Sequence, residues 1–124
     1  MPPPIRVLIA DDQPLFAKAL EALLSGEPGI EVVGRARNGE EAVEQALALE
    51  PDVILMDIAM PVLDGVEATK RIRAQRHGAC VLMLTGSNSR TDVDRAREAG
   101  AAGYVTKERI SAELIEAILE IAAR

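Results

Sequence analysis

Apolar and polar residues alternate along the chain in blocks that predict five strands, each followed by a helix. The run Val53–Met56 is apolar without interruption, and Ile5–Ala10 is interrupted by Arg6 alone. Runs of this kind are typical of strands that are covered on both faces in the centre of a parallel sheet. Three further runs predict the remaining strands: Ile30–Val33, Val81–Leu84 and Gly103–Thr106. The alternation therefore predicts a parallel sheet with helices on both faces.

Apolar residues spaced three or four positions apart predict the first helix. Pro14 suits its first turn and Ser25-Gly26 its end. Its expected buried face consists of six residues: Leu15, Phe16, Ala19, Leu20, Leu23 and Leu24. Capping signals predict where later helices begin.

Those signals are short polar side chains placed directly before helical patterns. Asn38 and Asp64 are each followed three residues later by a glutamate, Glu41 and Glu67, in the pattern of a capping box. Ser111 is the predicted cap of the last helix.

Two predicted helices depart from ordinary core patterning. The fourth, about Thr91–Ala99, offers Val93, Ala96 and Ala99 as its inner face, and alanines bury little area. This pattern fits a weakly held helix that moves easily, or a short surface helix. The last helix carries apolar residues over an arc of roughly 180°, wider than one buried face requires. Either this helix lies in a deep groove or part of its apolar arc contacts a partner. We favour the contact with a partner.

Three carboxylates follow the two central strands. Asp11 and Asp12 come directly after Ile5–Ala10, and Asp57 directly after Val53–Met56. Because the carboxyl ends of neighbouring parallel strands meet at one edge of a sheet, we expect these side chains to lie close together. Like charges at that distance raise one another's pKa and destabilise the fold unless a cation lies among them. Hard oxygen ligands suit Mg²⁺, so the sequence predicts a magnesium site.

Length and composition favour a single globular domain that does not bind nucleic acid. The 124 residues are enough for one domain, 1–124, with a self-sufficient core. A net charge of −6 disfavours a nucleic-acid surface, which needs basic residues to neutralise phosphates. The single Cys80 cannot form an internal disulfide, as expected in a reducing cytoplasm, and no apolar run approaches membrane-spanning length.

Four motifs together resemble a known family. They are Asp11-Asp12 after the first strand, DIAMPVLDG at 57–65, Thr85-Gly86 after VLML, and Lys107 after GYVT. In this order and at these strand ends they resemble the receiver domain of two-component response regulators, over nearly the whole chain. The resemblance implies a flavodoxin-like three-layer αβα sandwich with five helices and a five-stranded parallel sheet of order 2-1-3-4-5.

The resemblance also implies a role for each acidic residue. Asp57 would be the phosphoryl acceptor, forming an aspartyl phosphate. Asp11 and Asp12 would hold Mg²⁺ together with Asp57 and the backbone carbonyl of Ala59. No organic cofactor is implied.

Three further residues have implied roles near the phosphoryl group. Lys107 would place its ammonium against one phosphoryl oxygen, and Thr85 would donate its hydroxyl to another. Thr85 and Tyr104 match the family's switch pair, in which the aromatic ring turns inward when the threonine moves. On the residues alone, a lysine after a strand is more often a solvated surface charge, and a tyrosine on an edge strand is more often plain packing.

The implied function is phosphorelay signalling in the bacterial cytoplasm. A sensor histidine kinase or a phosphotransfer protein would supply the phosphoryl group. Phosphorylation would then switch the surface around the fourth helix, fifth strand and fifth helix toward formation of a homodimer or binding of a partner protein. The chain would catalyse its own phosphoryl transfer and slow autodephosphorylation, without a turnover substrate.

Two features resemble the subfamily with a LuxR-type helix-turn-helix output. Glu108 stands where many receivers have proline. The stretch EPGIEVVGRARNGEEAVEQA at 27–46 is also similar to the sequences of that subfamily. Because these 124 residues end at Arg124, we expect no output domain within them and no direct contact of this chain with nucleic acid. The sequence fits a stand-alone receiver and one excised from a longer regulator equally well.

Other classes fit the sequence less well. A flavodoxin needs amides and hydroxyls at its first turn, where Asp11-Asp12 would repel a phosphate, and a dehalogenase-type phosphatase needs an acid where Ala59 stands. The GxxxxGK[ST] motif of P-loop proteins is absent. The remaining alternative is a degenerate pseudo-receiver, a binding module independent of phosphorylation, which the complete set of motif residues disfavours.

Overall fold

Strands and helices alternate along the whole chain in a computed structural model that describes residues 3–86 and 90–123. The first half contains β1 Ile5–Ala10, α1 Pro14–Ser25, β2 Ile30–Ala36, α2 Gly39–Leu49 and β3 Val53–Asp57. The second half contains α3 Gly65–Gln75, β4 Cys80–Thr85, α4 Arg90–Glu98, β5 Gly103–Thr106, the 3₁₀ turn η1 Lys107–Arg109 and α5 Ile110–Ala122. The predicted succession of strands and helices is confirmed.

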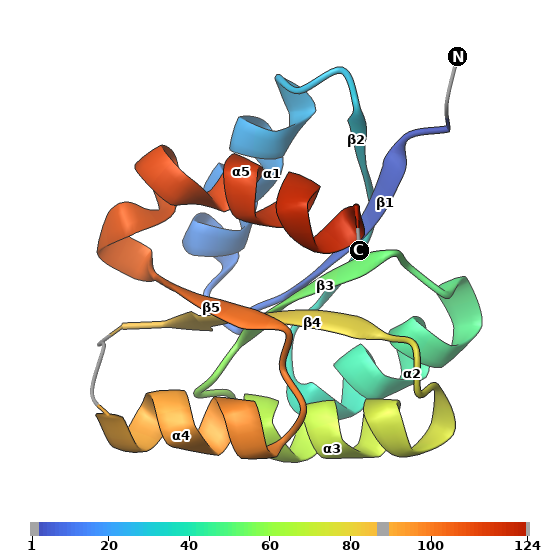
Figure 1. The fold of residues 1–124 in the computed structure, drawn as a ribbon, viewed down its shortest axis with the longest axis vertical. Helices are drawn as coiled ribbons and strands as arrows, with labels where there is room; N and C mark the ends of the chain where they lie inside the picture. Colours follow the sequence, from blue (N-terminus) through green and yellow to red (C-terminus); the bar gives the residue numbers. More distant parts are fainter. Residues whose placement is uncertain (1–2, 87–89, 124) are drawn as a thin grey trace.

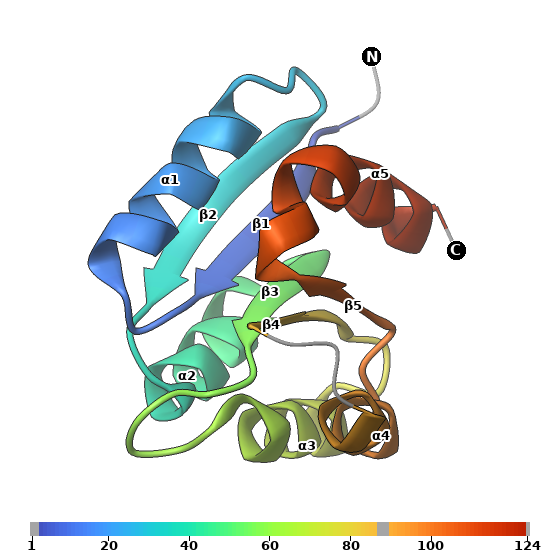
Figure 2. The same ribbon diagram turned by 90° about the vertical axis from the view of Figure 1, so that its left-hand side faces the viewer.

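The strands form one parallel sheet of order β2-β1-β3-β4-β5. Helices α1 and α5 cover one face, and α2, α3 and α4 cover the other, as Figures 1 and 2 show from two directions. This is the flavodoxin-like three-layer sandwich that the sequence predicted. It brings the carboxyl ends of β1, β3, β4 and β5 to one edge.

Side chains of the central strands alternate between two apolar cores. In β3, Val53 and Leu55 pack with α1 and α5, whereas Ile54 and Met56 pack with the opposite layer. All of these side chains are fully buried. The two-residue period of the strand thus divides one continuous apolar run between both faces of the sheet.

The buried face of α1 differs from the prediction. Leu15 is 84% exposed and Ala19 is also exposed, whereas Ala17, Leu20 and Leu24 are buried. An apolar pattern that contains several leucines and alanines does not by itself fix which of them face the sheet. The phase of the helix is set by its packing against β1 and β2.

The predicted N-caps of α2 and α3 are confirmed. Asn38 Oδ1 accepts a hydrogen bond of 2.9 Å from the Glu41 backbone N–H, and Asp64 Oδ1 accepts one of 2.9 Å from that of Glu67. Ser111 does not cap α5, because η1 winds the chain early and the helix begins at Ile110.

The two unusual helices keep the character that their sequences indicated. In α4, Ala96 is buried and Val93 half-buried, so little apolar area fixes this helix to the sheet. In α5, Leu114 and Ile118 are fully buried but Leu119 is 47% exposed. Part of the apolar arc of α5 therefore lies at the surface. Within residues 3–86 and 90–123, we find no helix with the length and hydrophobicity needed to cross a membrane.

Candidate phosphoryl-acceptor site

Asp57 is the last residue of β3, at the carboxyl edge of the sheet. Its side chain is buried, with 5% of the residue exposed. The Ala59 backbone N–H donates a hydrogen bond of 3.3 Å to Asp57 Oδ1. This bond orients the carboxyl group, and it leaves Oδ2 directed at the neighbouring strand ends.

Asp11 and Asp12 follow β1, which pairs directly with β3. Asp11 is buried, and its Oδ1 accepts a hydrogen bond of 2.8 Å from the Gln13 backbone N–H, while Asp12 is exposed. One carboxylate oxygen from each of Asp11, Asp12 and Asp57 lies within 4.8 Å of the others. The predicted acidic cluster is therefore present, with one side open to solvent at Asp12.

Lys107 lies directly after β5 and reaches into this cluster. Its Nζ is 3.3 Å from Asp11 Oδ2 and 3.4 Å from Asp57 Oδ2. Only 21% of the lysine side chain is exposed, so the ammonium is not a solvated surface charge. Three residues that are far apart in the sequence thus meet at one point.

The charge balance of the site is visible at Asp57. Burial, and next the charge of Asp11, raise the pKa of Asp57 to about 6, while the Lys107 ammonium and the Ala59 N–H oppose this shift. Burial is thus the main cause of the raised pKa, and the cluster holds three carboxyl groups beside one ammonium. A cluster of hard oxygen donors with excess negative charge fits a divalent cation such as Mg²⁺.

The loop after Asp57 is closely packed against it. A methyl group on Gly65 would collide with the Asp57 carbonyl oxygen, so glycine is required where α3 begins. In the same loop Val62 has φ +69°, and Leu63 N–H donates to the Pro61 carbonyl at 2.7 Å, as in a γ-turn. A β-branched residue rarely adopts this conformation, so the loop is held in a strained geometry.

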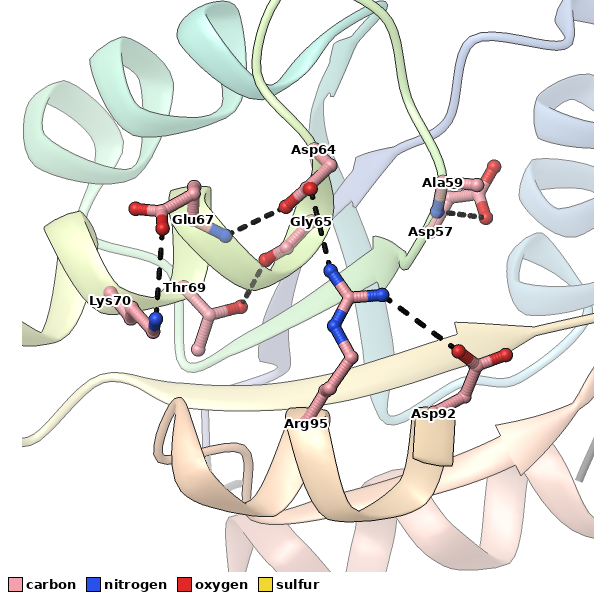
Figure 3. A network of polar contacts seen from close by, with 9 residues as sticks. All are labelled: Asp57, Ala59, Asp64, Gly65, Glu67, Thr69, Lys70, Asp92 and Arg95. Carbon is pink, nitrogen blue, oxygen red and sulfur yellow. Dashed lines mark hydrogen bonds and ion pairs between the residues drawn. The ribbon is translucent and has the colours of Figure 1, made fainter. Parts of the chain in front are cut away.

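Ionic contacts join this loop to α4. Figure 3 shows Asp64, the N-cap of α3, between the Glu67 N–H and the Arg95 guanidinium. Arg95 lies 3.6 Å from Asp64 and 3.9 Å from Asp92 of its own helix. This link between α4 and the Asp57 loop could not be predicted from the sequence, because it depends on how α3 and α4 lie side by side.

The two residues assigned to the switch lie on adjacent strands. Thr85 ends β4 and is buried, and it pairs in register with Thr106 of β5. Tyr104 is 44% exposed, so its ring points outward. A groove of about 310 Å³ lies between α4 and β5, lined by Val93, Ala96 and Tyr104 among others.

One neighbour of the site was predicted only as a core residue. Phe16 of α1 places its ring 4.2 Å from Lys107 Nζ, measured to the ring centroid. The sequence signal was an aromatic residue one helical turn beyond the acidic pair. Its contact with a lysine 91 positions away depends on the fold.

A parallel sheet of order 2-1-3-4-5, with three clustered carboxylates and a half-buried lysine at its carboxyl edge, defines the receiver type of the flavodoxin-like fold. The model of the response regulator receiver domain matches residues 7–119. The chain therefore belongs to the response regulator receiver domain family.

Relatives with different outputs share this domain. The transcriptional regulatory protein LnrK of Bacillus subtilis is 40% identical over 117 residues, which cover 94% of this chain and 53% of LnrK. A protein-glutamate methylesterase/protein-glutamine glutaminase of Pseudomonas putida is 46% identical over 106 residues, covering 83% of this chain and 28% of the enzyme. The chain thus spans about half the length of these curated relatives or less.

Solved structures support the predicted subfamily. A two-component response regulator of the LuxR family from an Aurantimonas species superposes with a TM-score of 0.93. It is 36% identical, and the match covers 97% of this chain and 86% of that one. The resemblance to receivers of LuxR-type regulators is confirmed.

Proposed function

We propose that the chain accepts a phosphoryl group on Asp57 from a sensor histidine kinase or a phosphotransfer protein in the cytoplasm. Receiver domains of this family are phosphorylated by histidine kinases. The observation that carries the proposal is the position of Lys107 Nζ, 3.3 Å from Asp11 and 3.4 Å from Asp57. In such an arrangement the carboxylate can accept a phosphoryl group, and the neighbouring ammonium can stabilise the negative charge of its oxygens.

The transfer itself needs an ionised Asp57. With a pKa of about 6, the carboxyl group is deprotonated at neutral pH and offers an oxygen lone pair. That oxygen forms a bond to phosphorus while the bond from phosphorus to the donor's nitrogen or oxygen breaks, and the leaving group keeps the electron pair. The hydrogen bond from Ala59 N–H to Oδ1 fixes the orientation of the attacking group.

The neighbouring side chains have distinct roles in this proposal. Asp11, Asp12 and Asp57, with the backbone carbonyl of Ala59, would hold Mg²⁺, which neutralises charge on the phosphoryl oxygens when bound. Lys107 donates to one phosphoryl oxygen.

The signal would leave the site through α4, β5 and α5. Thr85 would donate its hydroxyl to the phosphoryl group, and Tyr104 would turn into the groove of about 310 Å³ beneath α4. Support comes from the thin apolar face of α4 and from the outward position of Tyr104, which leaves that groove for the ring. The exposed Leu119 on α5 then belongs to a surface for a homodimer or a partner protein.

In the proposal, residues 1–124 act as one receiver module that controls an output through this surface. LnrK and the methylesterase carry different activities in addition to their matched regions. The output of this receiver is therefore left to the partner or domain that it controls. A pseudo-receiver that only binds a partner is the second candidate, and it is disfavoured by the assembled cluster of Asp11, Asp57 and Lys107.

Intact-mass spectrometry tests the chemistry. With acetyl phosphate and Mg²⁺, the wild-type chain should gain the mass of one phosphoryl group, and hydroxylamine should remove it as it does from acyl phosphates. Asp57→Asn should gain nothing, whereas the matched control Asp52→Asn, an exposed aspartate five residues earlier, should behave like the wild type. Full phosphorylation of Asp57→Asn would refute the assignment, and a wild-type chain that gains no mass would favour the pseudo-receiver.

A further inference from the structure

The ring of Phe16 forms a third contact to the Lys107 ammonium. The distance of 4.2 Å between Nζ and the ring centroid lies within the range of a cation–π interaction. Phe16 is half-buried on α1, whereas Lys107 follows β5. The ring therefore connects the first helix to the only lysine that the described residues place in the acidic cluster.

The three contacts to Lys107 differ in kind. Asp11 and Asp57 attract the ammonium as anions, and both are also the groups that a divalent cation or a phosphoryl group would engage. The Phe16 ring takes part in neither of those interactions. It can hold the ammonium near the cluster while the carboxylates change partners, because an aromatic face attracts a cation without being a metal ligand.

The surroundings of Phe16 leave room for the lysine to move. A groove of about 350 Å³ lies between α1 and α5, and it is lined by Phe16, Leu23 and Lys107 among others. A lysine has four flexible methylene groups. Without a ring beside its head group, the side chain could turn into this groove and away from Asp57.

We infer that Phe16 is a positioning residue for phosphoryl transfer, which acts by holding the Lys107 ammonium beside Asp57. The inference rests on the proposed function. It differs from plain packing in one respect: packing needs apolar volume, which leucine also supplies, whereas a cation–π contact needs an aromatic face.

The first test compares rates of phosphoryl uptake from acetyl phosphate at saturating Mg²⁺. Phe16→Leu should slow uptake by ~3- to 10-fold, the range that a partly buried cation–π contact allows. Phe16→Tyr keeps the aromatic face and should restore most of the rate. Leu23→Val alters the same groove on the same face of α1 and should stay within about twofold of the wild type. Equal rates for Phe16→Leu and the wild type would overturn the positioning role.

A double-mutant cycle shows whether the ring acts through the lysine. In a Lys107→Met background, replacing Phe16 by leucine should cause no further loss of rate. The same fold loss in both backgrounds would show that the ring supports the site in another way, and would overturn the inference.

A measurement without phosphodonor separates the contact from the proposed function. In the ¹³C–¹H spectrum, the methylene protons next to Lys107 Nζ should be shifted upfield by the ring, and Phe16→Leu should abolish that shift. Unchanged signals would overturn the contact itself. A wild-type chain that shows the shift but takes up no phosphoryl group would refute the proposed function. A wild-type chain that takes up the group at the same rate as Phe16→Leu would refute the positioning role alone.

Discussion

Helices α1 and α5 are attached to the sheet through much larger side chains than α2 and α4, which lie on the opposite face. On one face, α1 and α5 bury large residues such as Leu24 and Leu114, both fully buried. On the other face, α2 and α4 bury mainly alanines such as Ala46 and Ala96. Because an alanine buries much less apolar area than a leucine, the α4 side is held less strongly. Helix α3 of the same layer buries Val66 and Ile72, so the difference identifies α4 as the helix that can move at low free-energy cost.

The candidate site lies where these two layers meet. Lys107 and its ring contact belong to the firmly packed side, next to α1 and α5. The loop after Asp57 leads into α3 and is joined to α4 by the pair of Asp64 and Arg95. In the proposed function, a change of charge at Asp57 would pass from this firmly packed support to a thinly packed helix, which is the arrangement a switch needs.

The largest expected effect is on the firmly packed layer. Leu114→Ala should lower the free energy of unfolding by about 3–4 kcal/mol, because it leaves a cavity among fully buried side chains. Ala96→Gly in α4 should cost about 1 kcal/mol, mostly through helix propensity. Denaturant unfolding measures both. Equal losses for the two variants would contradict the claimed difference between α5 and α4.

The second prediction concerns the contact between the loop and the site. Gly65→Ala should destabilise the fold by about 2–3 kcal/mol and impair phosphoryl uptake, because its methyl group would strike the Asp57 carbonyl. Gly78→Ala is the matched control, since a methyl group there meets nothing within 4 Å. If Gly65→Ala is as stable and as active as Gly78→Ala, the packing of the loop does not hold Asp57 in place.

The third prediction is that Asp57→Asn is more stable than the wild type when no metal ion is present. Because the pKa of Asp57 is raised to about 6, the folded chain binds this proton more tightly than the unfolded chain does. Metal-free stability should therefore fall as the pH rises from about 4 to about 6, by up to ~3 kcal/mol. Asp57→Asn should remove that contribution, and at pH 7 it should be about 1–3 kcal/mol more stable than the wild type.

Melting curves at several pH values, with and without Mg²⁺, check this prediction. Mg²⁺ should raise the wild-type midpoint at pH 7 and have less effect on Asp57→Asn, because it compensates the same excess charge. A wild-type midpoint that is insensitive both to Mg²⁺ and to pH between 4 and 7 would count against the acidic site.

The smallest effect on stability is expected at the link to α4. Arg95→Met should change the free energy of unfolding by no more than about 0.5 kcal/mol, since both partners of the ion pair are partly exposed. Local opening should respond more strongly, and amide exchange in α4 should become faster. The control Arg37→Met removes an exposed pair with Glu41 and should leave α4 unchanged. If the amide exchange of α4 is unchanged in Arg95→Met, the ion pair does not couple α4 to the loop after Asp57.

Much of the site could be predicted because parallel topology places strand ends together. Once Asp11, Asp57 and Lys107 were assigned to the ends of β1, β3 and β5, their meeting at one edge followed from the fold. The capping residues Asn38 and Asp64 were equally predictable, since each acts on backbone groups three residues away.

The remaining features depend on packing between distant elements. The sequence placed Leu15 in the core, but the rotation of α1 on the sheet turns it outward. Ser111 was expected to cap α5, but the 3₁₀ turn at Lys107–Arg109 leads directly into a helix that already begins at Ile110. The ion pair of Asp64 and Arg95 joins two separate helices. It depends on how these helices pack, so no local sequence pattern predicts it.

Hydrogen exchange with and without beryllofluoride tests most directly whether chemistry at Asp57 moves the thinly packed helix α4. With Mg²⁺, beryllofluoride binds to an aspartate carboxylate in place of a phosphoryl group. Exchange should change in α4 and β5, between Arg90 and Thr106, while the peptides of β1 and of buried α1 stay the same. Asp57→Asn should show no response. Unchanged exchange over residues 85–122 in a wild-type chain that has bound beryllofluoride would contradict the switch and leave a phosphoryl carrier.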